Sequence, residues 1–163
     1  CLGALAAGFT CLWILGGVGI AAPGPTSGID SNGVPYIHAH GMWFRAMYQE
    51  MAGTFCLVFF FISQTESKTV ISQIETIHCF VLSASYMAAR CIVCGASPGV
   101  STYGAMLNPA FAIGIQISSW FGVAGDIGEA LKWIWLYPVL PLGGAILAII
   151  FFEFVYRKTQ TII

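Results

Sequence analysis

Charged side chains are scarce in this sequence. Of its 163 residues only 8% are charged and 58% are hydrophobic, whereas soluble domains carry about 25% charged residues. A soluble fold of this composition would lack the polar residues that its surface needs. We therefore predict a single multi-pass integral membrane domain over residues 1–163, with the lipid bilayer as its surroundings. The composition does not indicate which membrane.

Other absences narrow the function. The net charge is −1, so nothing suggests a nucleic-acid partner. No nucleophile–base set and no phosphate-binding loop is present, so we predict neither an enzyme nor a cofactor. Cys91 and Cys94 have the spacing of a metal or redox pair, but no second pair accompanies them, so two ordinary thiols are favoured. His38 and His40 could bind a metal, although solvation is the commoner fate of such a pair.

Four apolar segments are long enough to cross a bilayer, which takes about 20 residues. They are Leu2–Ala22, Ala46–Ser63, Ile71–Gly95 and Trp133–Phe152. We predict helices for all four, because an isolated strand cannot satisfy its backbone in lipid. If the helices alternate in direction, the cations of the 64–70 turn and of the C-terminus share one side, which favours a cytoplasmic C-terminus. Because the chain opens at Cys1 inside an apolar segment, we expect it to be part of a longer protein.

The most informative stretch is Asn108-Pro109-Ala110. Asn is a preferred N-cap, and Pro is favoured at the first helical position. The apolar run that follows lasts only to about Ser118, which gives a helix of roughly 16 Å. Such a half-helix ends inside the membrane, and this is tolerated only where it is buried in protein or lines a wet cavity. The predicted fold class is therefore all-α, with four long transmembrane helices and one re-entrant half-helix starting at Asn108.

Three separated pieces resemble the C-terminal half of an aquaporin, in the major intrinsic protein family, from its third to its sixth helix. The Gly-Ala-x-Leu-Asn-Pro-Ala signature stands at 104–110, with Gly114 after it. Glu50-Met-Ala-Gly-Thr-Phe55 is similar to the family's fourth helix, and 133–157 approximates its sixth. The resemblance implies a right-handed helix bundle. It also implies an absent N-terminal half or partner membrane subunits, with a homotetramer as a further expectation.

The resemblance further implies a pore for water or small neutral solutes. Asn108 would donate hydrogen bonds to the passing molecule, and Pro109 and Ala110 would complete the cap. Glu50 would be buried and accept hydrogen bonds from the loop 96–107. Gly104 and Gly114 would support that loop and the half-helix.

Two departures from the family pattern bear on the selectivity filter. Only one Asn-Pro-Ala is present, and Phe111 stands where water-selective members usually have Arg. Arg90 could replace the lost cation by placing its guanidinium over the pore mouth, beside Phe111. The competing interpretation is that Arg90 extends to the lipid headgroups.

Two functions remain open at this point. The first is a channel of the aquaporin family. The second is a non-conducting, aquaporin-like structural subunit of a larger membrane assembly.

Overall fold

The computed structural model describes residues 2–14, 28–29, 35–36, 42–94, 105–122 and 134–160. Within them the elements are helices α1 (Leu2–Ile14), α2 (Met42–Thr65), α3 (Glu75–Cys94), α4 (Pro109–Gly122) and α6 (Leu136–Phe151), the π-helical turn η1 (Phe152–Tyr156), helix α7 (Arg157–Gln160), and the two-residue strands β1 (Gly28–Ile29) and β2 (Pro35–Tyr36). The described part of the chain is helical apart from this short antiparallel strand pair, which lies in the predicted polar connection between the first two helices.

Three of the described helical segments are long and apolar enough to cross a membrane. They are Ala46–Thr65 in α2, Glu75–Cys94, and Leu136–Gln160, which runs through α6, η1 and α7. The fourth predicted span is not confirmed, because α1 is described only over the 13 residues Leu2–Ile14 and residues 15–22 lie outside the described part.

The predicted helix boundaries also need correction. Helix α2 is longer at both ends than the predicted Ala46–Ser63. Helix α3 begins at Glu75 rather than Ile71, because the Ser72 hydroxyl accepts a hydrogen bond from the Ile74 N–H and holds this segment in a turn.

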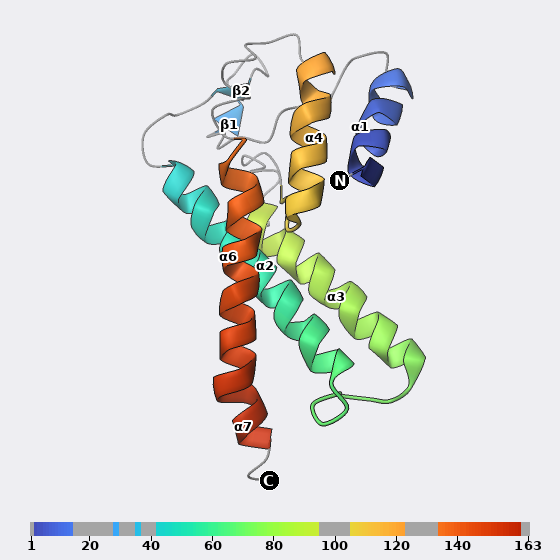
Figure 1. Ribbon diagram of the computed structural model, residues 1–163, viewed down its shortest axis with the longest axis vertical. Coiled ribbons are helices and arrows are strands. Elements are labelled where there is room, and N and C mark those ends of the chain that lie inside the picture. Colours follow the sequence, from blue (N-terminus) through green and yellow to red (C-terminus); the bar gives the residue numbers. More distant parts are fainter. Residues whose placement is uncertain are drawn as a thin grey trace.

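Helix α2 is the centre of the arrangement. It packs against both α6 and α3, while α4 packs against α1 and α6. Figure 1 shows α6 and α7 running along the long axis, with α1 and α4 side by side in the upper half of the view. Helix α4 begins near the mid-height of the molecule, above the end of α3 (Figure 1).

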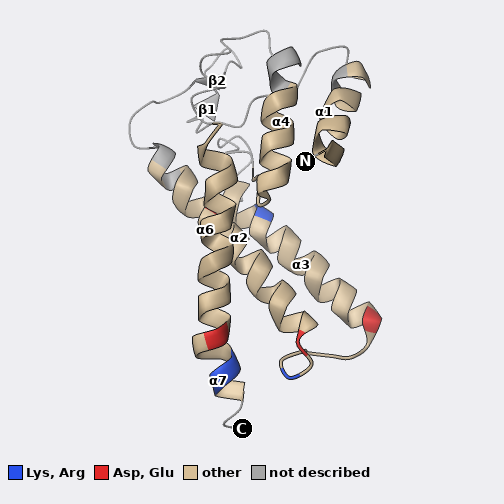
Figure 2. Cartoon of the chain, in the orientation of Figure 1, with Lys and Arg blue, Asp and Glu red and all other residues tan. Residues whose placement is uncertain are grey.

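The lower end of α2 is held to α6 and η1 by aromatic rings and an ion pair. The ring of Phe59 lies 5.7 Å from that of Phe151 and 5.1 Å from that of Tyr156, both edge-on. Arg157 pairs with Glu66 just beyond α2, at 3.2 Å. In Figure 2 most charges of the described helices gather at this lower end. The 64–70 turn and the C-terminal helix therefore share one end of the bundle, as predicted.

Close helix contacts depend on residues without side chains. A Cβ at Gly114 would collide with Ala4 of α1, and one at Gly8 would collide with Ser118 of α4. At the α2–α6 contact, a Cβ at Gly144 would collide with the Met51 carbonyl oxygen and lie 3.0 Å from the Cβ of Thr54. Small residues at these positions let the backbones approach.

Gly143 and Gly144 form a matched pair for testing this contact. A Cβ at Gly143 would meet only the flexible Met51 side chain, at 3.4 Å from its Cε. We expect Gly144→Ala to destabilise the protein by about 1–3 kcal/mol through overpacking. Gly143→Ala should leave stability nearly unchanged. Thermal unfolding of both variants in detergent measures this difference, and equal unfolding temperatures would contradict it.

Candidate functional site at the start of helix α4

Helix α4 begins as the sequence predicts. The Asn108 side-chain oxygen accepts a hydrogen bond from the Ala110 N–H at 2.9 Å, and the Asn108 carbonyl accepts one from Ala112 at 2.9 Å. Asn108 is thus the N-cap and Pro109 the first helical residue. The helix ends at Gly122, about one turn beyond the predicted end near Ser118. Its 14 residues span about 21 Å, still less than a bilayer core of about 30 Å.

The three residues before the cap have an unusual backbone. Ala105 and Leu107 have φ values of 45° and 53°, in the left-handed region that non-glycine residues seldom adopt. Alternating left-handed residues turn successive N–H groups to one side, which forms a concave acceptor site. The acceptor here is the Glu50 side chain on α2.

Glu50 bridges α2 to this loop. Its Oε1 accepts a hydrogen bond from the Met106 N–H at 2.9 Å, and its Oε2 accepts one from the Leu107 N–H at 3.1 Å. The side chain is 0% exposed. The burial of Glu50 and its hydrogen bonds to the 96–107 loop, both predicted from the sequence, are confirmed.

Packing keeps the loop against α2 and α3. Ala105 and Leu107 cluster with Ala89 and Val93 at the end of α3. A Cβ at Gly53, about one turn beyond Glu50, would lie 2.9 Å from the Leu107 side chain. The loop reaches the Glu50 carboxylate because this position has no side chain.

A cavity of about 250 Å³ opens at the N-terminus of α4. Its lining combines the cap, the two preceding residues and side chains from three helices: Leu57, Tyr86, Met106, Leu107, Asn108 and Phe111. Asn108 and Phe111 lie three residues apart at the start of α4, so they face the same side. Most of the wall is apolar, and Asn108 and Tyr86 supply its polar side-chain groups.

The two polar groups of the Asn108 side chain, its oxygen and its NH₂ group, have different roles. Its oxygen is used by the helix cap, so the NH₂ group is the end directed away from the helix. Asn108 is exposed to the cavity. The helix start also brings a partial positive charge and N–H groups without helical partners to this place.

Arg90 is not among the described residues that line the cavity. It is half-buried on α3 and close enough to Glu50 to attract its carboxylate electrostatically. This differs from the prediction that its guanidinium points into the cavity beside Phe111. The competing interpretation, in which Arg90 extends to the lipid headgroups, stays a prediction.

The other predicted residues are divided between two places. Phe111 lines the cavity, whereas Gly114 faces α1. Gly104 lies outside the described residues, as do His38 and His40. Cys91 and Cys94 are free thiols, and the described ranges hold no group of three metal-ligating side chains.

Two lining residues, Leu57 and Tyr86, were not predicted from the sequence. Leu57 lies seven residues after Glu50, on the same face of α2, and this spacing could have indicated it. Tyr86 had no comparable signal, because which face of α3 lines this cavity depends on how α3 packs on α2.

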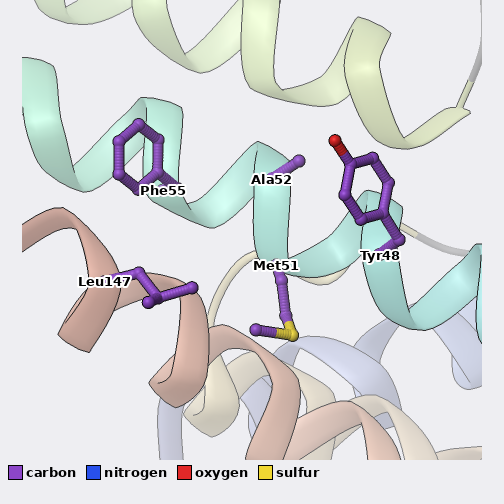
Figure 3. Close-up of a pocket in the computed structure, with 5 residues that line it drawn as sticks. All are labelled: Tyr48, Met51, Ala52, Phe55 and Leu147. Carbon is purple, nitrogen blue, oxygen red and sulfur yellow. The ribbon is translucent and has the colours of Figure 1, made fainter.

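A second cavity of about 250 Å³ lies between α2 and α6. Figure 3 shows its lining residues Tyr48, Met51, Ala52, Phe55 and Leu147. Tyr48, Ala52 and Phe55 share a face of α2 other than that of Glu50. Its apolar wall suits lipid tails better than a polar solute.

Comparison of the chain with protein-family models, with curated proteins and with solved structures gave no match. The aquaporin resemblance therefore rests on the sequence motifs.

Replacing the Glu50 carboxylate tests whether it orders the 105–107 loop. Glu50→Ala leaves two buried N–H groups without acceptors, at about 1–3 kcal/mol each. We expect faster hydrogen exchange in peptides covering 105–107, measured by mass spectrometry. Glu75→Ala removes an exposed acid from the first turn of α3 and should leave this exchange unchanged. Unaltered exchange in Glu50→Ala would show that the carboxylate does not order the loop.

Proposed function

We propose that this protein is a membrane channel of the aquaporin kind, passing water or small neutral solutes. The observation that carries the proposal is the capped start of α4, which opens onto a cavity lined by residues of three apolar helices. A helix that starts inside a membrane needs hydrogen-bond partners for its first N–H groups, since each N–H group exposed to lipid costs several kcal/mol. A cavity that admits water or a polar solute would supply their partners.

The site's charge favours neutral solutes. The start of α4 carries a partial positive charge equivalent to roughly half an elementary charge. Cations and protons are repelled there, and a neutral solute is not. The Asn108 NH₂ can donate hydrogen bonds to an oxygen of the passing molecule. Nothing in this arrangement requires a covalent step.

The described helices supply one side of such a pore. The opposing side would come from an absent N-terminal half or from partner membrane subunits. The same proposal includes a re-entrant course of α4, a right-handed helix bundle and a homotetramer.

The alternative is a non-conducting subunit of a larger membrane assembly. Helix α3 exposes large apolar side chains such as Phe80 and Met87 along its length, and this alternative places them in an interface with a protein partner. These side chains suit a protein partner as well as they suit lipid.

Asn108→Ser separates the channel from this alternative. Serine still caps the helix but has no NH₂ donor. We expect unchanged folding and solute permeability lower by about fivefold, the equivalent of one hydrogen bond of about 1 kcal/mol. Swelling of vesicles that contain the full-length protein measures the permeability.

Gln73→Ser is the matched control, because it removes an exposed amide from the 66–74 loop, outside the cavity. Wild-type protein that folds but does not raise the permeability of the vesicles would favour the structural subunit.

A further inference from the structure

The last turn of α3 carries two thiols that the proposed function does not use. Cys91 and Cys94 stand three residues apart, so their side chains are neighbours on one face of the helix. Both thiols are free in this structure, and Cys91 is exposed whereas Cys94 is half-buried. They are close enough to interact electrostatically. The pair therefore combines an accessible thiol with a neighbour that is packed into the fold.

Cys94 connects this pair to the start of α4. Its side chain packs against the cluster that the 105–107 loop forms with the end of α3. It also lies close enough to Glu50 to interact electrostatically with the carboxylate that binds the loop. Because packed interiors transmit small shifts, a displacement of Cys94 acts on the loop and on the helix start that follows it.

The spacing of the two cysteines permits a disulfide, but only a strained one. Residues three apart in an α-helix have Cα atoms about 5 Å from each other, within the range of about 4.4–6.8 Å that a disulfide spans. Their Cβ atoms are about 5–6 Å apart, whereas a disulfide holds them at about 3.5–4.5 Å. Cys94 is the last residue of α3, so the bond would draw it toward Cys91 and away from the cluster. Strained disulfides are readily reduced again, which suits a reversible switch.

We propose that Cys91 and Cys94 form a redox-sensitive dithiol, whose oxidation to a disulfide loosens the 105–107 loop and the start of α4. The oxidant is hydrogen peroxide, a small neutral molecule that reaches the exposed Cys91 thiol. The effect on the loop is independent of any transport. An effect on permeability rests on the proposed channel function.

The oxidation takes two steps. The Cys91 thiolate attacks one peroxide oxygen and breaks the O–O bond, which leaves a sulfenic acid on Cys91; the departing hydroxide takes up the thiol proton and becomes water. The Cys94 thiol then attacks the Cys91 sulfur, which forms the S–S bond and releases the sulfenic oxygen as a second water. Two thiols are thus oxidised to one disulfide, and one peroxide is reduced to two waters. A dithiol reductant reverses the change.

Peptide mass spectrometry tests whether the bond forms. The full-length protein is treated with hydrogen peroxide, its remaining thiols are alkylated, and the chain is cleaved after Arg90 and Lys132. The resulting peptide contains Cys91 and Cys94 and no other cysteine. We expect it to lose two hydrogen atoms on oxidation and to regain them when dithiothreitol is added before alkylation.

Hydrogen exchange measures what the bond does to the loop. We expect the 105–107 amides of the oxidised protein to exchange about fivefold faster, the equivalent of about 1 kcal/mol, and reduction should restore the slower rate. In Cys91→Ser, peroxide should leave this exchange unchanged because the bond cannot form. Cys79→Ser is the matched control: it removes another exposed thiol of α3 and should keep the full response.

The outcomes separate this proposal from the channel function. A peptide that keeps both hydrogen atoms, or gains oxygen atoms instead, overturns the dithiol. A disulfide that forms without changing exchange at 105–107 overturns its control of the loop, as does an equal response in Cys91→Ser. A wild-type protein that forms the bond and shows the faster exchange, but never raises the permeability of vesicles, overturns the channel function alone.

Discussion

The carboxylate of Glu50, buried between α2 and the 105–107 loop, is the interaction on which the candidate site depends. It accepts the Met106 and Leu107 N–H groups through its two oxygens. The loop must therefore enter the bundle and turn at the depth of Glu50. Helix α4 starts where the loop ends, so the depth of Asn108 and its cavity follows from one carboxylate on α2.

The free energies of these interactions are consistent with Glu50 determining the conformation of the loop. Left-handed φ values cost about 1–2 kcal/mol at each non-glycine residue, and Ala105 and Leu107 both have them. Hydrogen bonds to a charged group contribute about 1.5–3 kcal/mol each. Two such bonds contribute about 3–6 kcal/mol, which is comparable with the strain of about 2–4 kcal/mol at the two residues. Contacts of α4 with α1 and α6 hold the helix in place beyond the loop.

The features that depend on neighbouring residues could be predicted from the sequence. Asn108 and Pro109 specify a helix start because capping is a property of adjacent residues. Glu50 is an acid inside an apolar run, and such a residue must find buried partners. The resemblance to aquaporins implied the 96–107 loop as the partner, and the hydrogen bonds from Met106 and Leu107 confirm that Glu50 has this partner.

The sequence could not give the parts that depend on tertiary packing. Hydrophobicity placed the start of α3 too early, because it does not register the Ser72 turn. Arg90 could be placed on α3, but its attraction to Glu50 depends on how α2 and α3 cross. In the sequence Tyr86 is one more aromatic residue in an apolar segment, and only the packing of α3 on α2 places it in the cavity wall. Periodicity shows which residues share a face but not what that face meets.

The central claim is that α4 begins in a wet cavity, and cysteine accessibility tests it directly. Phe111 lines the cavity at the start of α4, and Leu147 lines the second cavity, between α2 and α6. Their exposed fractions are similar, 38% and 47%. Each is replaced by cysteine in a full-length protein whose native cysteines are alanine, and labelled in intact membranes with a small anionic thiol reagent. The account predicts fast labelling of Phe111→Cys and slow labelling of Leu147→Cys. Equally slow labelling of both would contradict it, because the start of α4 would then be dry.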